Sequence, residues 1–232
     1  MLRNLILSAA VAGLVAGLLT AALQHVTTTP IILEAERYES AAPAQDHSGL
    51  PAGVTIATYG HEAEWAPADG IERTLQTSLA TVVLGIGFSL ALLGIMVLTG
   101  RAVDGRVGLA FGVAGFAALA LAPSVGLPPE IPGSGAADLG DRQAWWILTV
   151  LATAGGLGAL LLGRNIVFWA GGLALIVLPH IVGVPRPAAF ASTAPAELAG
   201  HFAAASLAVT AVFWAVLGSA SGSIYKRLAR AG

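Results

Sequence analysis

Six apolar stretches, each close to the length of a bilayer crossing, dominate this sequence and limit what it can fold into. They cover residues 4–26, 75–98, 107–125, 144–162, 166–184 and 198–217. A membrane-spanning helix needs about 20 predominantly apolar residues. With 56% hydrophobic and only 10% charged residues, the chain lies outside the range of soluble globular proteins. We therefore predict an all-α, polytopic transmembrane helix bundle of about six spans, with residues 1–232 forming a single integral membrane domain.

The first apolar stretch has some features of a signal peptide. Arg3 precedes it, and the small residues Ala21 and Ala22 lie near its end. The apolar core of a signal peptide has about 7–15 residues, whereas this stretch has the roughly 20 residues of a span. We expect it to remain in the protein as the first span.

The basic residues predict which ends of the spans face the cytoplasm. If the N-terminus lies inside, seven of the 11 basic residues fall in inner segments, as the positive-inside rule requires. The inner ones are Arg3, Arg101, Arg106, Arg164, Lys226, Arg227 and Arg230, and the outer ones are Arg37, Arg73, Arg142 and Arg186. Both termini are then cytoplasmic, and residues 27–73 form an extracytoplasmic loop between the first two spans.

The same orientation places the acidic residues and the histidines outside. Asp104 is the only inner residue among 13 acids, and all five histidines (His25, His47, His61, His180 and His201) fall on the outer face. Acidic residues contribute little to membrane topology, so another cause is needed. A negatively charged outer face would raise the local concentration of cations.

Histidine together with carboxylate indicates a divalent transition metal. These groups suit ions such as Co²⁺, Ni²⁺ and Zn²⁺, whereas Cu(I) prefers thiolate and thioether ligands. The chain has no cysteine, and its only methionines are Met1 and Met96. The predicted ligands are taken from the outer face: His25, Glu34, Glu36, His61, Glu64, His180 and His201.

Two of these ligand pairs follow from spacing. His180 and His201 flank the short connection between the last two spans, so they can share a depth near the outer rim. His61 and Glu64 are three residues apart and would lie on one face of a helical turn. His180 follows Pro179, and its ring could equally end the helix by bonding to a freed carbonyl.

Other polar or small residues near the spans have structural interpretations. Glu130, within "GLPPEIPG", is either a solvated carboxylate or one that attracts cations. Trp145 and Trp146 open the fourth span and are expected to form part of an interfacial aromatic belt. Glycines at helix-contact spacing are predicted to pack helices together; they are Gly13, Gly17, Gly108, Gly112, Gly155, Gly156 and Gly158.

Motifs for catalysis or nucleic-acid binding are missing from the sequence. It contains no HExxH, no GxSxG and no glycine-rich phosphate loop after a strand, so we expect no catalytic residues and no resident cofactor. Basic patches interleaved with aromatic residues are also missing, and nucleic acid is not an expected partner. An alternative to metal transport is a non-transporting membrane protein, such as a metal sensor, an assembly factor, or a quinone- or haem-binding subunit that uses His180 and His201.

Five strings along the chain resemble the CbtA family, which is proposed to form the membrane subunit of a bacterial cobalt transporter. They are "LRNLILSAAVAGLVAGLLTAALQHVTTTPIILEAERYE", "EWAPADGIERTLQT", "PSVGLPPEIPG", "DLGDRQAWW" and "LPHIVGVPRP". The resemblance implies a multi-pass protein of the bacterial cytoplasmic (inner) membrane. It also implies uptake of cobalt(2+) for cobalamin synthesis, with cobalt as the transported substrate.

The resemblance implies a partner as well: a small, single-span, histidine-bearing subunit of the CbtB-like kind. The lipid bilayer is the other expected partner, and oligomerisation is left open. The family is expected to have five spans rather than six, and the first stretch or residues 198–217 would account for the difference. No acidic residue or histidine falls at mid-membrane, where a bare ion is very costly. A partner, or backbone carbonyls and the Ser and Thr side chains of the spans, would have to complete the path.

Overall fold

Helices make up most of the part of the chain that the structure describes. The computed structural model describes residues 2–41, 70–187 and 192–231, and all of its regular elements are helices. In chain order they are α1 (Leu2–Val26), α2 (Thr28–Ala41), α3 (Ile71–Leu98), α4 (Gly105–Phe116), the π-helical turn η2 (Ala117–Leu121), α5 (Ala122–Ser124), α6 (Leu139–Leu162), α7 (Ile166–Val182) and α8 (Ala196–Ala231). The predicted all-α helix bundle is confirmed.

Five of the described helical segments are long and apolar enough to cross a membrane. They are α1, α3, the continuous segment Gly105–Ser124, α6 and α8. The sixth apolar helix, α7, has 17 residues, because Gly183 ends it with φ +99° and two prolines follow closely. We expected α1 or the 198–217 stretch to be the marginal span, and this was wrong: α1 has 25 residues and α8 has 36.

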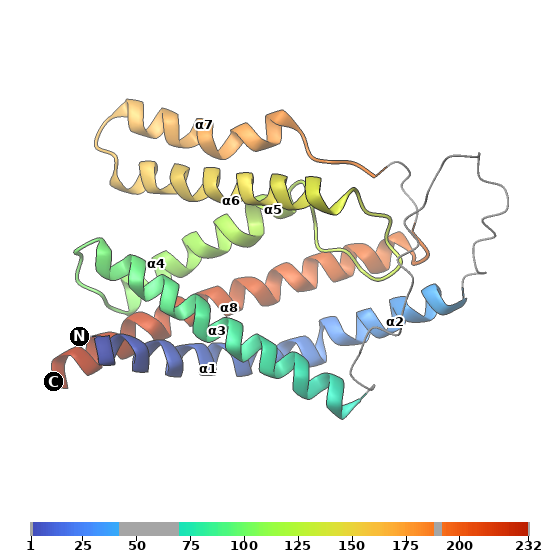
Figure 1. Cartoon of the computed structure of the whole chain (residues 1–232), viewed down its shortest axis with the longest axis horizontal. Coiled ribbons are helices and arrows are strands. Elements are labelled where there is room, and N and C mark those ends of the chain that lie inside the picture. The colour runs from blue at the N-terminus through green and yellow to red at the C-terminus, as the bar shows by residue number, and fades with distance from the viewer. Residues whose placement is uncertain (1, 42–69, 188–191, 232) are drawn as a thin grey trace.

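The apolar helices alternate in direction, so the connections gather at two ends of the bundle (Figure 1). The inner end, as we name it, holds both termini and the connections 99–104 and 163–165. The outer end holds α2, the connection 125–138 and the segment that follows α7. As the sequence predicted, all the described acidic residues except Asp104 lie at the outer end, whereas seven of the 11 basic residues lie at the inner end.

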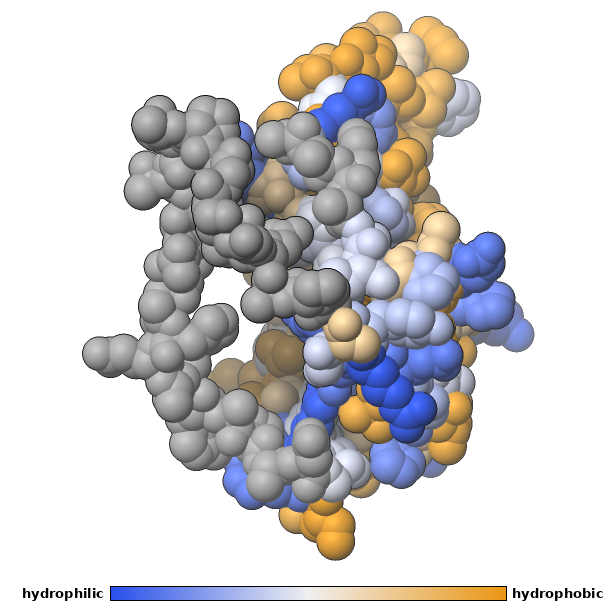
Figure 2. Space-filling model, turned by 90° about the vertical axis from the view of Figure 1, so that its right-hand side faces the viewer, coloured by the Kyte–Doolittle hydropathy of each residue, from blue (hydrophilic) through white to orange (hydrophobic). Residues whose placement is uncertain are grey.

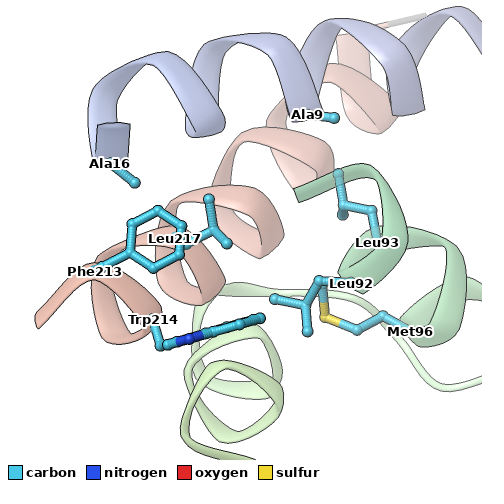
Figure 3. Packing of buried hydrophobic residues seen from close by; sticks show 8 residues of the cluster. All are labelled: Ala9, Ala16, Leu92, Leu93, Met96, Phe213, Trp214 and Leu217. Atoms are coloured by element: carbon cyan, nitrogen blue, oxygen red, sulfur yellow. The ribbon is translucent and has the colours of Figure 1, made fainter. Parts of the chain in front are cut away.

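Four helices, α1, α3, α4 and α8, form the body of the protein. Its core brings together residues of α1, α3 and α8 (Figure 3), among which Leu93, Met96 and Leu217 are fully buried. Phe88 of α3 packs against Phe213 and Trp214 of α8, with ring centroids 6.3 and 5.1 Å apart. α8 lies against all three other helices of the body and is its central element.

Glycines let the helices of the body approach until their backbone atoms are in contact. A Cβ atom on Gly13 of α1 would lie 2.4 Å from the backbone of Ile86 in α3. A Cβ atom on Gly108 of α4 would lie 2.1 Å from the carbonyl oxygen of Gly218 in α8. The predicted packing role is therefore confirmed for the glycines of α1 and α4. In lipid, where burial drives helix association only weakly, such close contact is a main source of stability.

Helices α6 and α7 form a separate hairpin. They meet at Gly156 and Gly172, where a Cβ atom on either glycine would lie less than 3 Å from the carbonyl oxygen of the other. Among the described helices, α7 packs extensively against α6 alone, and α6 in turn joins the body through α4, η2 and α5. Figure 1 shows the hairpin as a layer beside the body, with α7 at its outer edge.

A small apolar cluster ties the outer end together. Ala35 of α2, Ile131 of the connection 125–138 and Ala194 before α8 are buried against one another, and Phe202 packs beside them. The proline-rich connection containing Glu130 is thereby held between α2 and α8.

Candidate functional site

The polar side chains at the outer end come from several helices. His25 lies in the last turn of α1, His180 in the last turn of α7, and His201 in the second turn of α8. The described acids other than Asp104 lie at the same end, mostly on α2, the start of α6 and the connection before it. Figure 2 looks onto this end and shows hydrophilic residues from its centre to the right-hand margin, with apolar residues mainly at the top and bottom.

His180 lies against Trp145 of α6. The two ring centroids are 5.7 Å apart with an edge-on geometry, and Trp145 Nε1 donates a hydrogen bond of 3.2 Å to the carbonyl oxygen of Pro179. Trp145 is only 6% exposed, so it joins the two helices of the hairpin and does not belong to an interfacial belt as expected. The His180 ring makes no hydrogen bond within the described ranges, so the predicted carbonyl contact is not formed there.

The remaining described candidates lie on the surface of the outer end. His25, Glu34 and His201 are exposed. Glu36 already has a partner, because both of its carboxylate oxygens accept from the guanidinium of Arg73, one of them at 3.1 Å. This ion pair holds α2 against the start of α3.

The predicted ligands do not form a cluster in the described part of the chain. His61 and Glu64 lie outside the described residues, within 42–69. Among the residues that are described, no three His, Asp or Glu side chains are close enough together to hold a metal ion. The ligand set of His25, Glu34, Glu36, His180 and His201 stays a prediction that this single chain does not assemble.

The pair His180 and His201 does not occupy facing helices. α7 packs extensively only along α6, and its outer end is well separated from the start of α8 in Figure 1. Haem ligation by two histidines requires their rings to face each other across the cofactor. The observed helix arrangement does not favour the haem-binding alternative.

A recess opens beside Glu130, in the seam between the hairpin and the body. Its volume is about 630 Å³, and its walls come from η2, α5, α6 and α8. At its rim Arg142 of α6 donates to a carboxylate oxygen of Glu130 at 2.7 Å. Glu130 is therefore ion-paired, and this partner was not predicted because it depends on how α6 packs beside the connection that precedes it.

The buried polar groups of the spans are hydroxyls. Ser89 of α3 and Ser221 of α8 share a hydrogen bond of 2.7 Å, and both are fully buried. Thr20 of α1 and Thr153 of α6 are almost fully buried, and their hydroxyls have no partner among the described residues. Neutral oxygen ligands are thus available inside the bundle, whereas the described spans bury no carboxylate or imidazole.

An ion pair joins two helices of the body at the inner end. Asp104 caps α4 by accepting from the backbone N–H groups of Arg106 and Val107, and its other oxygen lies 3.3 Å from Lys226 of α8. The hydrogen bond from Val107 and the bond from Lys226 hold the pKa of Asp104 below its ordinary value. This acid therefore stays ionised and joins two helices of the body.

Five apolar helices of spanning length, a shorter sixth helix and the separation of charge between two ends define a multi-pass membrane protein. The sequence model of one protein family, described as probable cobalt transporter subunit (CbtA), matches residues 2–226. The chain belongs to the CbtA family. Neither the curated proteins nor the solved structures contain a match to it.

Proposed function

We propose that this protein is the membrane subunit for uptake of a divalent transition metal, and that the metal is cobalt used for cobalamin synthesis. The protein works in the bacterial cytoplasmic membrane and captures the ion at its outer end. The observation that carries the proposal is the gathering of histidines and carboxylates at the end opposite both termini, in a chain of the CbtA family.

The chemistry of the outer end supports a divalent ion of intermediate softness. Imidazole and carboxylate are suitable ligands for Co²⁺. His25 and His201 are exposed at the outer end, and the His180 ring makes no hydrogen bond among the described residues. We assign capture to these histidines together with Glu34 and Glu36, and to His61 and Glu64 of the loop.

A partner subunit completes the coordination. The family description names a subunit, and the described residues alone bring no three ligands together. A small, single-span, histidine-bearing chain of the CbtB-like kind would supply the missing imidazoles at the outer rim. Transport then depends on both chains.

The route through the bundle uses neutral oxygen atoms. The described spans bury Ser and Thr hydroxyls and no carboxylate or imidazole. A bare divalent ion in hydrocarbon is very costly, so hydroxyls and backbone carbonyls must replace part of its water shell. The sequence has no ATP-binding motif, so the membrane potential, an ion gradient or another subunit drives the ion inward.

Uptake of radioactive cobalt tests the proposal. Cells expressing the protein with its partner are compared with cells carrying His180→Ala combined with His201→Ala, at equal abundance in the membrane. We expect uptake to fall by about tenfold or more, because each lost metal ligand weakens binding by a kilocalorie or more. His47→Ala is the matched control and should leave uptake unchanged. Equal uptake by the double variant and the wild type would remove these histidines from the capture site.

A further inference from the structure

The recess beside Glu130 reaches from the outer end into the depth of the bundle. α6 lines it from Leu139 to Ile147, a rise of about 12 Å along the helix axis. Glu130 and Arg142 lie at its rim, and Leu119, Ile147 and Thr210 lie deeper. By contrast, α1 and α3 meet at backbone contact distance at Gly13 and Gly17.

The two outer ion pairs differ in how firmly the carboxylate is held. Arg73 bonds to both oxygens of Glu36, whereas Arg142 bonds to one oxygen of Glu130. The Nε atom of Arg142 is buried and has no hydrogen-bond partner among the described residues. A two-point contact between arginine and carboxylate is stronger and more directional than a single bond. Another cation can therefore displace the arginine more easily from Glu130 than from Glu36.

The size of the recess suits an ion that keeps its water. One water molecule occupies about 30 Å³ in the liquid, so six first-shell waters need roughly 180 Å³. The recess has about 630 Å³, and Glu130 and Arg142 of the outer end are among the residues that line it. A divalent ion can reach Glu130 without losing its hydration shell, which avoids most of the cost of placing charge beside the bundle.

Most of the lining is apolar, but it also offers neutral oxygen atoms. Ser124, Gln143 and Thr210 line the recess together with Leu119 and Ala120 of the π-helical turn. Pro123 follows that turn and has no N–H, so one carbonyl of the turn loses its helical donor. Such wide turns occur frequently at functional sites. Hydroxyl, amide and carbonyl oxygens can replace water around a divalent ion.

We propose that this recess is the outer vestibule for a hydrated divalent cation, with Glu130 as its capture carboxylate and Arg142 as a tethered cation that the ion displaces. The inference rests on the proposed function and adds a specific point of access for the substrate. Arg142 remains nearby after displacement, and its charge keeps the site weak. A site for transport must bind its ion firmly enough to admit it and weakly enough to release it.

Paired measurements of binding and uptake test the vestibule. Glu130→Gln and Arg142→Gln are compared with the wild type by equilibrium dialysis of radioactive Co²⁺ against the purified complex. The same variants are assayed for the cobalt dependence of uptake in proteoliposomes. Glu197→Gln and Arg186→Gln serve as matched controls, because both residues lie at the outer end and neither lines the recess.

We expect Glu130→Gln to raise the half-saturating Co²⁺ concentration by about tenfold or more, because it removes the charged ligand. Arg142→Gln should lower that concentration several-fold, because the competing cation is gone. Unchanged binding and uptake in both variants, with active wild type, would overturn the vestibule and leave the proposed function standing. Binding that depends on Glu130, with no uptake by the wild type, would support the vestibule and overturn the transport function.

Discussion

The body and the α6–α7 hairpin hold their helices together by different means. The body combines glycine contacts with a core of large side chains, including Leu93, Phe213 and Trp214. The hairpin relies on the approach of Gly156 to Gly172 and on Trp145, which bonds to the Pro179 carbonyl. The body is therefore the scaffold, and the hairpin is attached to it along one side.

The recess lies where the tightly packed body and the more lightly attached hairpin meet. Its walls come from η2, α5 and α8 of the body side and from α6 of the hairpin. A seam between a tightly packed region and a lightly attached one can open without disturbing the core. We expect substitutions in the body to lower the stability of the whole fold, and substitutions in the hairpin to loosen the hairpin while the body stays folded.

The largest effect is expected from Gly108→Val in the body. Even a Cβ atom here would lie 2.1 Å from the Gly218 carbonyl oxygen, so α4 and α8 would have to move apart. We expect a loss of about 3 kcal/mol in stability, seen as reduced membrane abundance and a lower unfolding temperature in detergent. Gly87→Ala is the control, since a Cβ atom at that glycine meets nothing within 4 Å. Normal abundance of Gly108→Val would mean that the close α4–α8 contact is not essential.

Gly156→Val should loosen the hairpin and leave the body intact. Its Cβ atom would lie 2.5 Å from the Gly172 carbonyl oxygen, but α7 has extensive contact with α6 only. The cost, about 1–3 kcal/mol, should be confined to the α6–α7 contact. The chain has no native cysteine, so a thiol introduced by Thr153→Cys reports on the hairpin and one introduced by Ser221→Cys reports on the body. Gly156→Val should speed maleimide labelling at 153 alone; equal acceleration at both positions would show that the two regions unfold together.

A smaller effect is expected from the Ser89–Ser221 hydrogen bond in the body. Ser89→Ala removes one partner of this fully buried pair, and hydrogen bonds between membrane helices contribute about 0.6 kcal/mol on average. The free energies of unfolding of the wild type, Ser89→Ala, Ser221→Ala and the double variant together form a double-mutant cycle. Additive losses would show that the two hydroxyls do not act as a pair.

The smallest effect is expected at the inner end, from Asp104→Asn. The amide can still accept from the N–H groups of α4, but the ion pair with Lys226 is lost. Because folding lowers the pKa of Asp104, the stabilisation is present above about pH 3.9, its unfolded value. It is lost as the pH falls through the lower folded pKa. The difference in unfolding temperature between wild type and variant should therefore shrink in acid, and a constant difference would contradict the ion pair.

The helices and the two ends of the bundle followed from the sequence, because hydropathy and charge act on local segments. Glycine spacing identified Gly108 as a packing residue, but its partner Gly218 lies in another helix and could not be assigned without the fold. α8 runs well past residue 217 because its polar continuation contains no proline and Gly222 still packs against Asp104. Trp145 was misjudged because its burial depends on the neighbouring α7.

The candidate site was predictable only in outline. Its end of the molecule followed from the positions of His25, His180 and His201. The recess could not be predicted, because it arises from the way α6 packs against the π-helical turn and α8. The pairing of Glu130 with Arg142 depends on the same arrangement.

The brevity of α7 affects the surrounding lipid. Its 17 residues extend about 26 Å, less than the roughly 30 Å of a typical hydrocarbon core. Several of its large apolar side chains are exposed, including Ile166, Phe168 and Ile181. Acyl chains beside the hairpin must therefore shorten or disorder to match it, at a cost of a fraction of a kilocalorie per mole for each ångström of mismatch. Hydrophobic mismatch would make this edge of the protein the place where the bilayer is thinnest, on the hairpin whose other helix, α6, lines the recess.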